Sequence, residues 1–179
     1  HAVKNLDWIV GKKQKNNGWF ADCDNTVKRN DRPILHTIAY TIDGLLDSGI
    51  YLDEQRYIDA ARKAADVLKE KFGRDGFLHG RYNEDWEGSE HMILTGCAQM
   101  SVVWQKMAHY SGIREYAETA SAMNSLLVML QRRNRRKGNT GTTGAVNGSY
   151  PLWGRYEPFA YPNWATKYLA DALMLEVNQ

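Results

Sequence analysis

The sequence has 179 residues, of which 43% are hydrophobic and 25% are charged. A chain of this size and composition can bury the core of one domain and is unlike a disordered protein. Its 23 basic and 21 acidic residues leave a formal net charge of +2, so the charge balance gives no reason to expect a nucleic acid partner. No apolar run approaches 18 residues, and we therefore predict no membrane span.

Six stretches carry apolar residues at the 3.6-residue spacing of an α-helix, and good helix formers fill many of the positions between them. In chain order they cover residues 3–13, 34–48, 54–72, 92–110, 114–131 and 162–177. Gly49 and Gly112 follow predicted helices, and we expect each of them to form a C-terminal cap.

The helices come in pairs that repeat along the chain. Tyr57 and Tyr116 open similar segments 59 residues apart, and the segments that begin at Leu35 and Leu94 have the same separation. A third copy begins at Tyr161, after an enlarged polar loop. The first helix of each pair is apolar on most of its surface, whereas the second has a charged face. This alternation predicts a row of helical hairpins with buried inner helices and amphipathic outer helices.

Segments at the ends of these hairpins resemble a known group of proteins. Residues 14–19, followed by an inner helix that opens at Leu35, are similar to the α/α-toroid proteins, which include six-hairpin glycosidases, sugar epimerases, terpenoid cyclases and prenyltransferases. Residues 148–153 and 161–165 resemble uncharacterised bacterial toroid proteins linked to polysaccharide biosynthesis. The resemblance implies an all-α fold, a partial α/α toroid with about three inner and three outer helices.

The length of the chain bears on how much of such a ring it forms. A closed ring of six hairpins needs about twice this length. We therefore expect residues 1–179 to be a single domain, either the C-terminal part of a longer ring or a half-ring that a homodimer completes.

In a helical toroid, the N-termini of the inner helices and the loops that enter them form the mouth of the cavity. This places residues 22–40, 81–99 and 153–167 together. Helix N-termini carry partial positive charge and free backbone N–H groups, which suit anionic or oxygen-rich ligands.

Two residues of the first inner helix are candidates for proton transfer. His36 lies at its start, and Tyr40 follows four residues later on the same face. We predict that His36 is a general acid or base and that Tyr40 orients the substrate. The alternative is that His36 is a buried histidine that caps the helix or a neighbouring loop.

Carboxylates in the same loops form a second set of candidates. Glycoside cleavage usually needs two carboxyl groups, one protonated and one ionised, on either side of the bond. Asp22 with Asp85 is the pair that we predict, and Asp24 with Glu157 is an alternative. In the simpler interpretation, these carboxylates cap loops and carry solvated charge.

Aromatic, basic and amide side chains in these segments are candidates for substrate contact. Flat rings stack on sugar faces and also stabilise cations on a polyprenyl chain, and arginine binds carboxylate or phosphate through two hydrogen bonds. The alternative is that the loop aromatics only cover the ends of the core, which we favour for Trp19 and Trp164. The predicted substrate-binding residues are Trp86, Trp153, Arg81, Arg155, Gln99, Tyr161, Asn163 and Lys167.

A metal site would have to use the few cysteines and histidines near the mouth. Cys23, Cys97 and His36 could meet there, but the repeat places Cys97 where Ile38 stands, which indicates a core position. We predict neither a metal nor a cofactor. The basic run at residues 132–137 lacks interleaved aromatics, so we interpret it as a solvated hairpin end and expect no nucleic acid there.

These features together favour a carbohydrate-processing protein, glycosidase-like or epimerase-like, that acts on an oligosaccharide or polysaccharide. Its partner would be a carbohydrate or another small-molecule ligand. Two alternatives stay open: a non-catalytic glycan-binding or assembly subunit that uses the same cleft, and an enzyme that processes polyprenyl or terpenoid chains. Because many reactions share the toroid fold, the residues at the mouth have to decide between them.

Overall fold

The computed structural model of the chain describes residues 1–24, 31–89, 91–133 and 140–178, and its regular secondary structure is almost entirely helical. The longer elements are α1 (Ala2–Trp8), which continues as the π-helical turn η1 (Ile9–Lys13), α2 (Leu35–Leu52), α3 (Gln55–Asp75), α4 (Leu94–Ser111), α5 (Arg114–Arg133) and α6 (Asn163–Val177). The shorter elements are the strands β1 (Met92–Ile93) and β2 (Ser149–Tyr150) and the 3-10 turn η2 (Thr140–Thr142).

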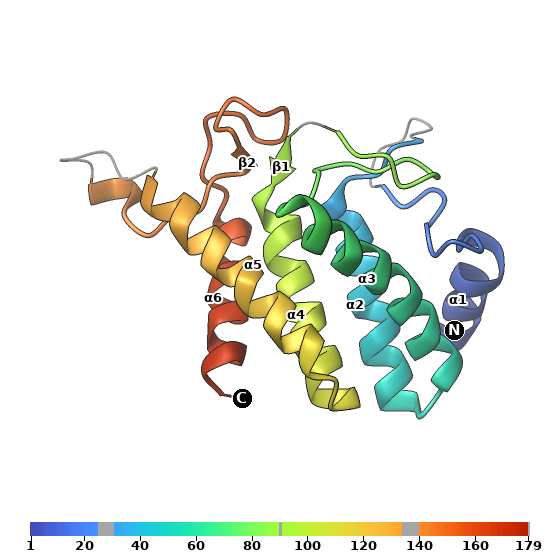
Figure 1. Ribbon diagram of the computed structural model, residues 1–179. Helices are drawn as coiled ribbons and strands as arrows, with labels where there is room; N and C mark the ends of the chain where they lie inside the picture. The colour runs from blue at the N-terminus through green and yellow to red at the C-terminus, as the bar shows by residue number, and fades with distance from the viewer. Residues whose placement is uncertain (25–30, 90, 134–139, 179) are drawn as a thin grey trace.

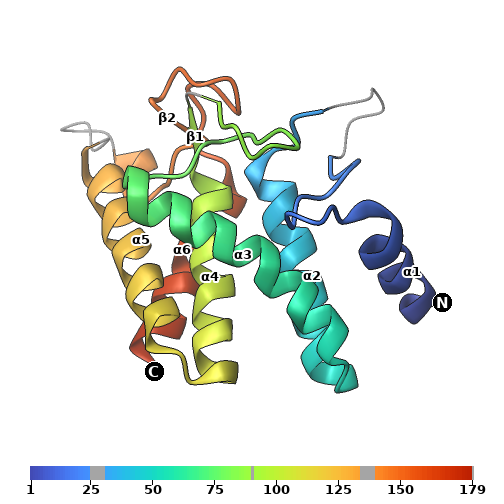
Figure 2. The same ribbon diagram turned by 45° about the vertical axis from the view of Figure 1, so that its right-hand side comes forward.

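The helices form two layers (Figures 1 and 2). Helices α2, α4 and α6 lie side by side in one layer, and α3 and α5 pack against them from the other. The N-termini of α2, α4 and α6 all lie at the edge that carries the long loops, and α1 lies beyond α2 at the end of the row. The predicted alternation of inner and outer helices is confirmed.

Burial explains the difference between the layers. In α4, every residue from Leu94 to Gln105 is buried, because α2, α5 and α6 surround this helix. Helix α3 buries one face, which includes Tyr57, Ala61 and Leu68, and exposes the charged one. The largest buried side chain is Trp104, whose indole N–H donates to the carbonyl of Ala65 in α3 at 3.2 Å. Inner and outer layers are therefore joined by apolar packing with polar groups satisfied inside it.

The loops cap the inner helices in the same way in successive hairpins. The backbone N–H of Leu35, the first residue of α2, donates to the carbonyl of Gly80 at 2.8 Å. The N–H of Leu94, the first residue of α4, donates to the carbonyl of Gly148 at 3.1 Å. Each bond satisfies a backbone donor that a helix cannot satisfy within its own first turn. The loop that follows each outer helix thus holds the start of the inner helix in the same hairpin.

Two sequence-based expectations at helix ends need correction. Residues 92 and 93 are not helical, because they form β1 and pair antiparallel with β2 in the register Met92–Tyr150 and Ile93–Ser149. Gly49 is not a cap: α2 runs on to Leu52 and ends at Asp53, which has the left-handed conformation. Gly112 is the left-handed cap of α4, as predicted. Within the described ranges, none of the helices combines the length and the apolar character that a membrane span requires.

Candidate functional site

Four polar side chains from three inner helices meet near the loop edge, and we call them the inner-face cluster: His36 and Tyr40 of α2, Gln99 of α4 and Tyr168 of α6. His36 Nδ1 lies 2.6 Å from Gln99 Oε1. The hydroxyl of Tyr168 donates to the hydroxyl of Tyr40 at 2.8 Å. The His36 ring lies 4.7 Å from the Tyr40 ring and 6.4 Å from the Tyr168 ring, measured between centroids.

The hydrogen bond to Gln99 determines how His36 can act. An amide oxygen only accepts, so Nδ1 of His36 carries the proton, and Nε2 is the ring nitrogen that can accept one. Nε2 has no hydrogen bond to any residue that the structure describes. Burial lowers the pKa of His36 below its ordinary value, while the hydrogen bond to Gln99 acts in the opposite direction. A neutral histidine of this kind can serve as a base near neutral pH.

The tyrosines extend the cluster from α2 to α6. Burial is the largest cause of a raised pKa at Tyr168, the hydrogen bond with Tyr40 raises it further, and a hydrogen bond from Gln99 lowers it. Gln99 itself is only 4% exposed, so its amide is fixed between His36 and Tyr168. Tyr40, by contrast, is exposed and can present its hydroxyl to a ligand.

A second polar layer lies two helical turns below the first. Asp43 is seven residues after His36, and Lys106 is seven residues after Gln99, so each pair shares one helix face. The ammonium of Lys106 lies 2.7 Å from Asp43 and 2.8 Å from Asp47. Burial raises the pKa of Asp43, and Lys106 opposes this. These two layers make the inner face between α2 and α4 polar over several turns.

A glycine allows the two helices to come this close. A Cβ on Gly96 would lie 2.8 Å from the backbone nitrogen of His36 and 2.9 Å from the carbonyl carbon of Leu35. Neither backbone atom can move without moving the start of α2. Gly96 therefore lets α4 touch α2 at the height where Gln99 meets His36.

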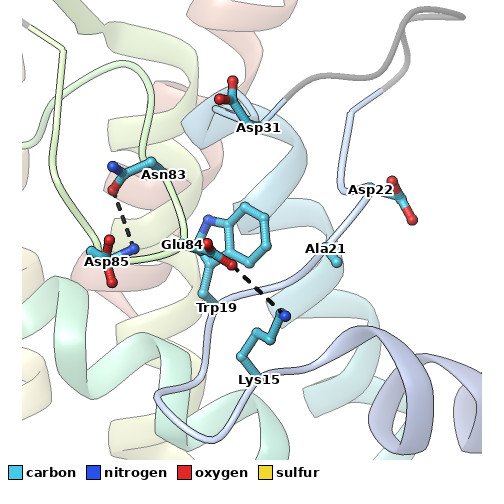
Figure 3. Close-up of a pocket in the computed structure, with 8 residues that line it drawn as sticks. All are labelled: Lys15, Trp19, Ala21, Asp22, Asp31, Asn83, Glu84 and Asp85. Atoms are coloured by element: carbon cyan, nitrogen blue, oxygen red, sulfur yellow. Dashed lines mark hydrogen bonds and ion pairs between the residues drawn. The ribbon is translucent and has the colours of Figure 1, made fainter.

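The predicted carboxylate pair lies elsewhere, in a pocket of about 240 Å3 that also contains Asp31 and Glu84. We call this the acidic pocket. Figure 3 shows Asp22 and Asp85 on opposite sides of Trp19, with Asp22 directed away from the ring. Asp22 forms an ion pair with Lys13, and the backbone N–H of Asp85 donates to Asn83 Oδ1 at 3.2 Å. Two loops thus bring the carboxylates of Asp22 and Asp85 to one pocket, but the two carboxyl groups do not point at a common position.

The two tryptophans that we predicted as sugar contacts have different surroundings. Trp86 is only 4% exposed, and its indole N–H donates to the carbonyl of Asn17 at 3.1 Å. A ring buried in this way presents no face to a saccharide, so we leave Trp86 out of the site. Trp153 is 66% exposed on the loop that follows β2 and remains available for contact.

The predicted arginines share a second pocket at the loop edge. Arg81 and Arg155 both line a cavity of about 460 Å3, together with Tyr156. Of the remaining predicted contacts, Tyr161 is half-buried and Asn163 is the exposed first residue of α6.

Lys167 is engaged within its own helix. Its ammonium forms an ion pair with Asp171 at 2.6 Å and lies 4.2 Å from the centre of the Tyr168 ring. Lys167 therefore borders the inner-face cluster through its contact with the ring of Tyr168.

The cysteines do not approach His36 as ligands. Cys97 is fully buried in the apolar core, and Cys23 is buried with its sulfur 3.1 Å from the hydroxyl of Thr41. Burial raises the pKa of Cys23 to about 11 and that of Cys97 to about 12. In the ranges that the structure describes, no three His, Cys, Asp or Glu side chains group as metal ligands.

Sequence reasoning missed Tyr168 and Lys106, and it noted Tyr156 among the aromatic residues of the loops without assigning it to the site. Tyr168 lies four residues after Trp164, a spacing that keeps the two on the same side of α6. Lys106 follows Gln99 by seven residues. Extending each candidate along its helix face would have found both. Tyr156 lies in an irregular loop, where no such spacing applies.

No family model matches the chain, and no curated protein matches it in sequence. A solved structure of an unsaturated glucuronyl hydrolase variant, named together with dGlcA-Glc-Rha-Glc, has the six-hairpin glycosidase fold and matches 99% of this chain and 48% of that one. Its TM-score is 0.66 at 16% sequence identity. This chain has the α/α-toroid fold.

A second solved structure has a similar fold. It is described as a novel alpha-amylase from Clostridium perfringens, with a TM-score of 0.56 and 8% identity, and the match covers 97% of this chain and 52% of that one. The toroid formed here is partial, with α2, α4 and α6 as its inner helices. The chain spans about half the length of both structures that it matches.

Proposed function

We propose that this partial toroid is a carbohydrate-processing protein in which the inner-face cluster binds a saccharide and His36 transfers a proton. The observation that carries the proposal is the arrangement of His36: the hydrogen bond to Gln99 fixes its Nδ1 proton, and Nε2 is left to accept one. The two neighbours of the fold are both named as enzymes of carbohydrates or with a saccharide, which supports this substrate class.

The geometry favours proton transfer by His36 over hydrolysis by two carboxylates. Hydrolysis needs two carboxyl groups that flank one bond. Asp22 and Asp85 are directed apart in the acidic pocket, and Asp43 is held by Lys106. An epimerase-type reaction needs one group to remove a proton and another to supply one. His36 can remove it, and the exposed hydroxyl of Tyr40, polarised by Tyr168, can supply it.

The test compares His36→Gln with two control variants. Glutamine can still hydrogen-bond to Gln99, so the fold and the binding of a saccharide should be kept. His109→Gln removes an exposed histidine from the far end of α4, and Asp85→Asn removes a carboxylate from the acidic pocket. Incorporation of deuterium from solvent at the carbon atoms of the saccharide, followed by NMR, reports proton transfer to carbon, the step that an epimerase-type reaction requires.

We expect His36→Gln to lower the rate by about 10² to 10⁴-fold, the usual contribution of a general acid or base, while binding measured by calorimetry changes little. Both control variants should react like the unmodified protein. Full activity of His36→Gln would refute the proposed role of His36. If Asp85→Asn is the variant that loses activity, the acidic pocket is the reacting site.

A second candidate function is a glycan-binding subunit without catalysis. It is favoured by the divergent directions of the predicted carboxylates in the acidic pocket. In that case, no exchange of saccharide protons occurs with any variant, and Tyr40→Ala and Trp153→Ala weaken binding while His36→Gln does not.

A further inference from the structure

The second pocket at the loop edge is lined by an unusual set of charges. We call it the basic pocket, and its charged or polar lining residues include Arg32, Arg81, His91, Arg155, Ser149 and Tyr156. It lies between the loop after α3 and the loop after β2, next to Ile93, the residue that precedes α4. Three guanidinium groups therefore line a single cavity of about 460 Å3.

The three guanidinium groups differ in the partners that the structure describes. Arg81 donates to the carbonyl of Arg32 at 2.9 Å and lies 3.4 Å from the carboxylate of Asp24. Arg32 lies 3.8 Å from the exposed carboxylate of Glu87. Arg155 forms no ion pair with a described carboxylate, and its side chain is exposed. Because like charges in one cavity repel each other, an anion that enters the pocket is stabilised.

The hydrogen bonds of Arg81 also orient its guanidinium. The carbonyl of Arg32 and the carboxylate of Asp24 both engage the same nitrogen, Nη1. Neither bond uses Nη2 or Nε, so the rest of the fork can bind an oxyanion. Planar guanidinium groups suit carboxylate, phosphate and sulfate because they donate two parallel hydrogen bonds.

Tyr156 connects the basic pocket to the inner-face cluster. It lines the pocket, and its ring lies 6.3 Å from the His36 ring, measured between centroids. Trp164 of α6 donates to its hydroxyl at 3.1 Å, and Ser149 donates to its backbone carbonyl. These contacts hold Tyr156 between the two regions. An oligosaccharide with one ring beside His36 would therefore place a neighbouring ring at the three arginines.

We propose that the basic pocket binds the anionic substituent of an acidic saccharide whose adjacent ring occupies the inner-face cluster. This inference rests on the proposed function and specifies its substrate class. The shared chemistry is an oxyanion on a sugar, which is a carboxylate in a uronic acid and a phosphate in a sugar phosphate. The guanidinium of Arg155 attracts this anion, and no described carboxylate already pairs with its charge.

The experiment measures binding of three matched disaccharides by calorimetry: a neutral glucose disaccharide, the same disaccharide with a glucuronic acid ring, and the same disaccharide with a 6-phosphate. Arg155→Gln is the test variant, because this exposed side chain has no ion pair with a described carboxylate whose loss could unfold the protein. Arg114→Gln is the control, since it removes another exposed arginine, from the outer helix α5, where it pairs with Glu118 at the surface.

We expect at least one acidic disaccharide to bind about tenfold more tightly than the neutral one, and the one that does identifies the anion. Arg155→Gln should remove most of this advantage and leave neutral binding unchanged, whereas Arg114→Gln should change neither. Raising the salt concentration from about 0.05 M to about 0.5 M should weaken only the acidic ligand, because salt screens the exposed charge.

The possible failures differ from one another. Equal binding of acidic and neutral disaccharides, or an acidic advantage that survives Arg155→Gln, overturns the basic pocket and leaves the proposed function standing. If no disaccharide binds but inorganic phosphate binds and requires Arg155, the saccharide assignment is refuted together with the proposed function.

Discussion

The inner-face cluster and the acidic pocket lie at the same edge of the toroid, but their side chains are organised in opposite ways. In the cluster, His36, Gln99, Tyr168 and Tyr40 come from three helices and form hydrogen bonds with one another. In the acidic pocket, the carboxylates of Asp22 and Glu84 pair with lysines, and the large ring of Trp19 is buried between Asp22 and Asp85. Residues on neighbouring regular helices converge, whereas residues on loops satisfy local partners first.

The largest effect that would test this contrast is on stability, in the loop that carries Asp85. Trp86→Ala should lower the free energy of unfolding by about 3–5 kcal/mol, because a buried aromatic ring is lost. Trp153→Ala should change it by less than about 0.5 kcal/mol, since that ring is exposed. Urea unfolding followed by circular dichroism gives both values. A Trp86 variant as stable as the Trp153 variant would contradict the buried placement.

The hydrogen bond between Tyr40 and Tyr168 gives a smaller effect that tests the cluster. Tyr40→Phe and Tyr168→Phe should each lower the free energy of unfolding by about 0.5–1 kcal/mol. The double variant should lose less than the sum of the two single variants, because both remove the same bond, although only Tyr168→Phe also loses the hydrogen bond from Gln99. A thermodynamic cycle from urea unfolding measures this coupling. Strictly additive losses would show that the two hydroxyls act independently.

The smallest effect concerns pH. The lowered pKa of His36 means that the unfolded chain, where histidine titrates near 6.5, binds a proton more readily than the native protein. The contribution of His36 to stability is therefore complete above about pH 6.5 and is lost as the pH falls towards the lowered native pKa. Between pH 7 and pH 5, the free energy of unfolding should therefore decrease less for His36→Gln than for the unmodified protein.

A parallel variant separates this contribution from a similar one. His79 also has a pKa lowered by burial and lies in the loop after α3, where its ring packs against Phe77 and Tyr82. His79→Gln should flatten the pH dependence independently, and the two changes should add. If His36→Gln leaves the slope untouched, the native pKa of His36 is not lowered.

Much of the fold could be predicted from the sequence because its signal is periodic. Leu35 and Leu94 have the same separation as Tyr57 and Tyr116, and they are the first residues of α2 and α4. His36 and Gln99 could be placed at one edge because regular helices keep their spacing. The direction of Asp22, the burial of Trp86 and the pairing of β1 with β2 depend on irregular backbone and on contacts between distant loops, for which a single sequence has no comparable period.

The missing side chain of Gly96 has a consequence for how this site could change. Adding one methyl group there would push the first turns of two neighbouring helices apart without replacing any polar side chain. Gln99 would then withdraw from the imidazole that it orients, and the ring would be free to choose either tautomer. The ring orientation on which the proposed proton transfer depends can thus be tuned from a position that carries no side chain.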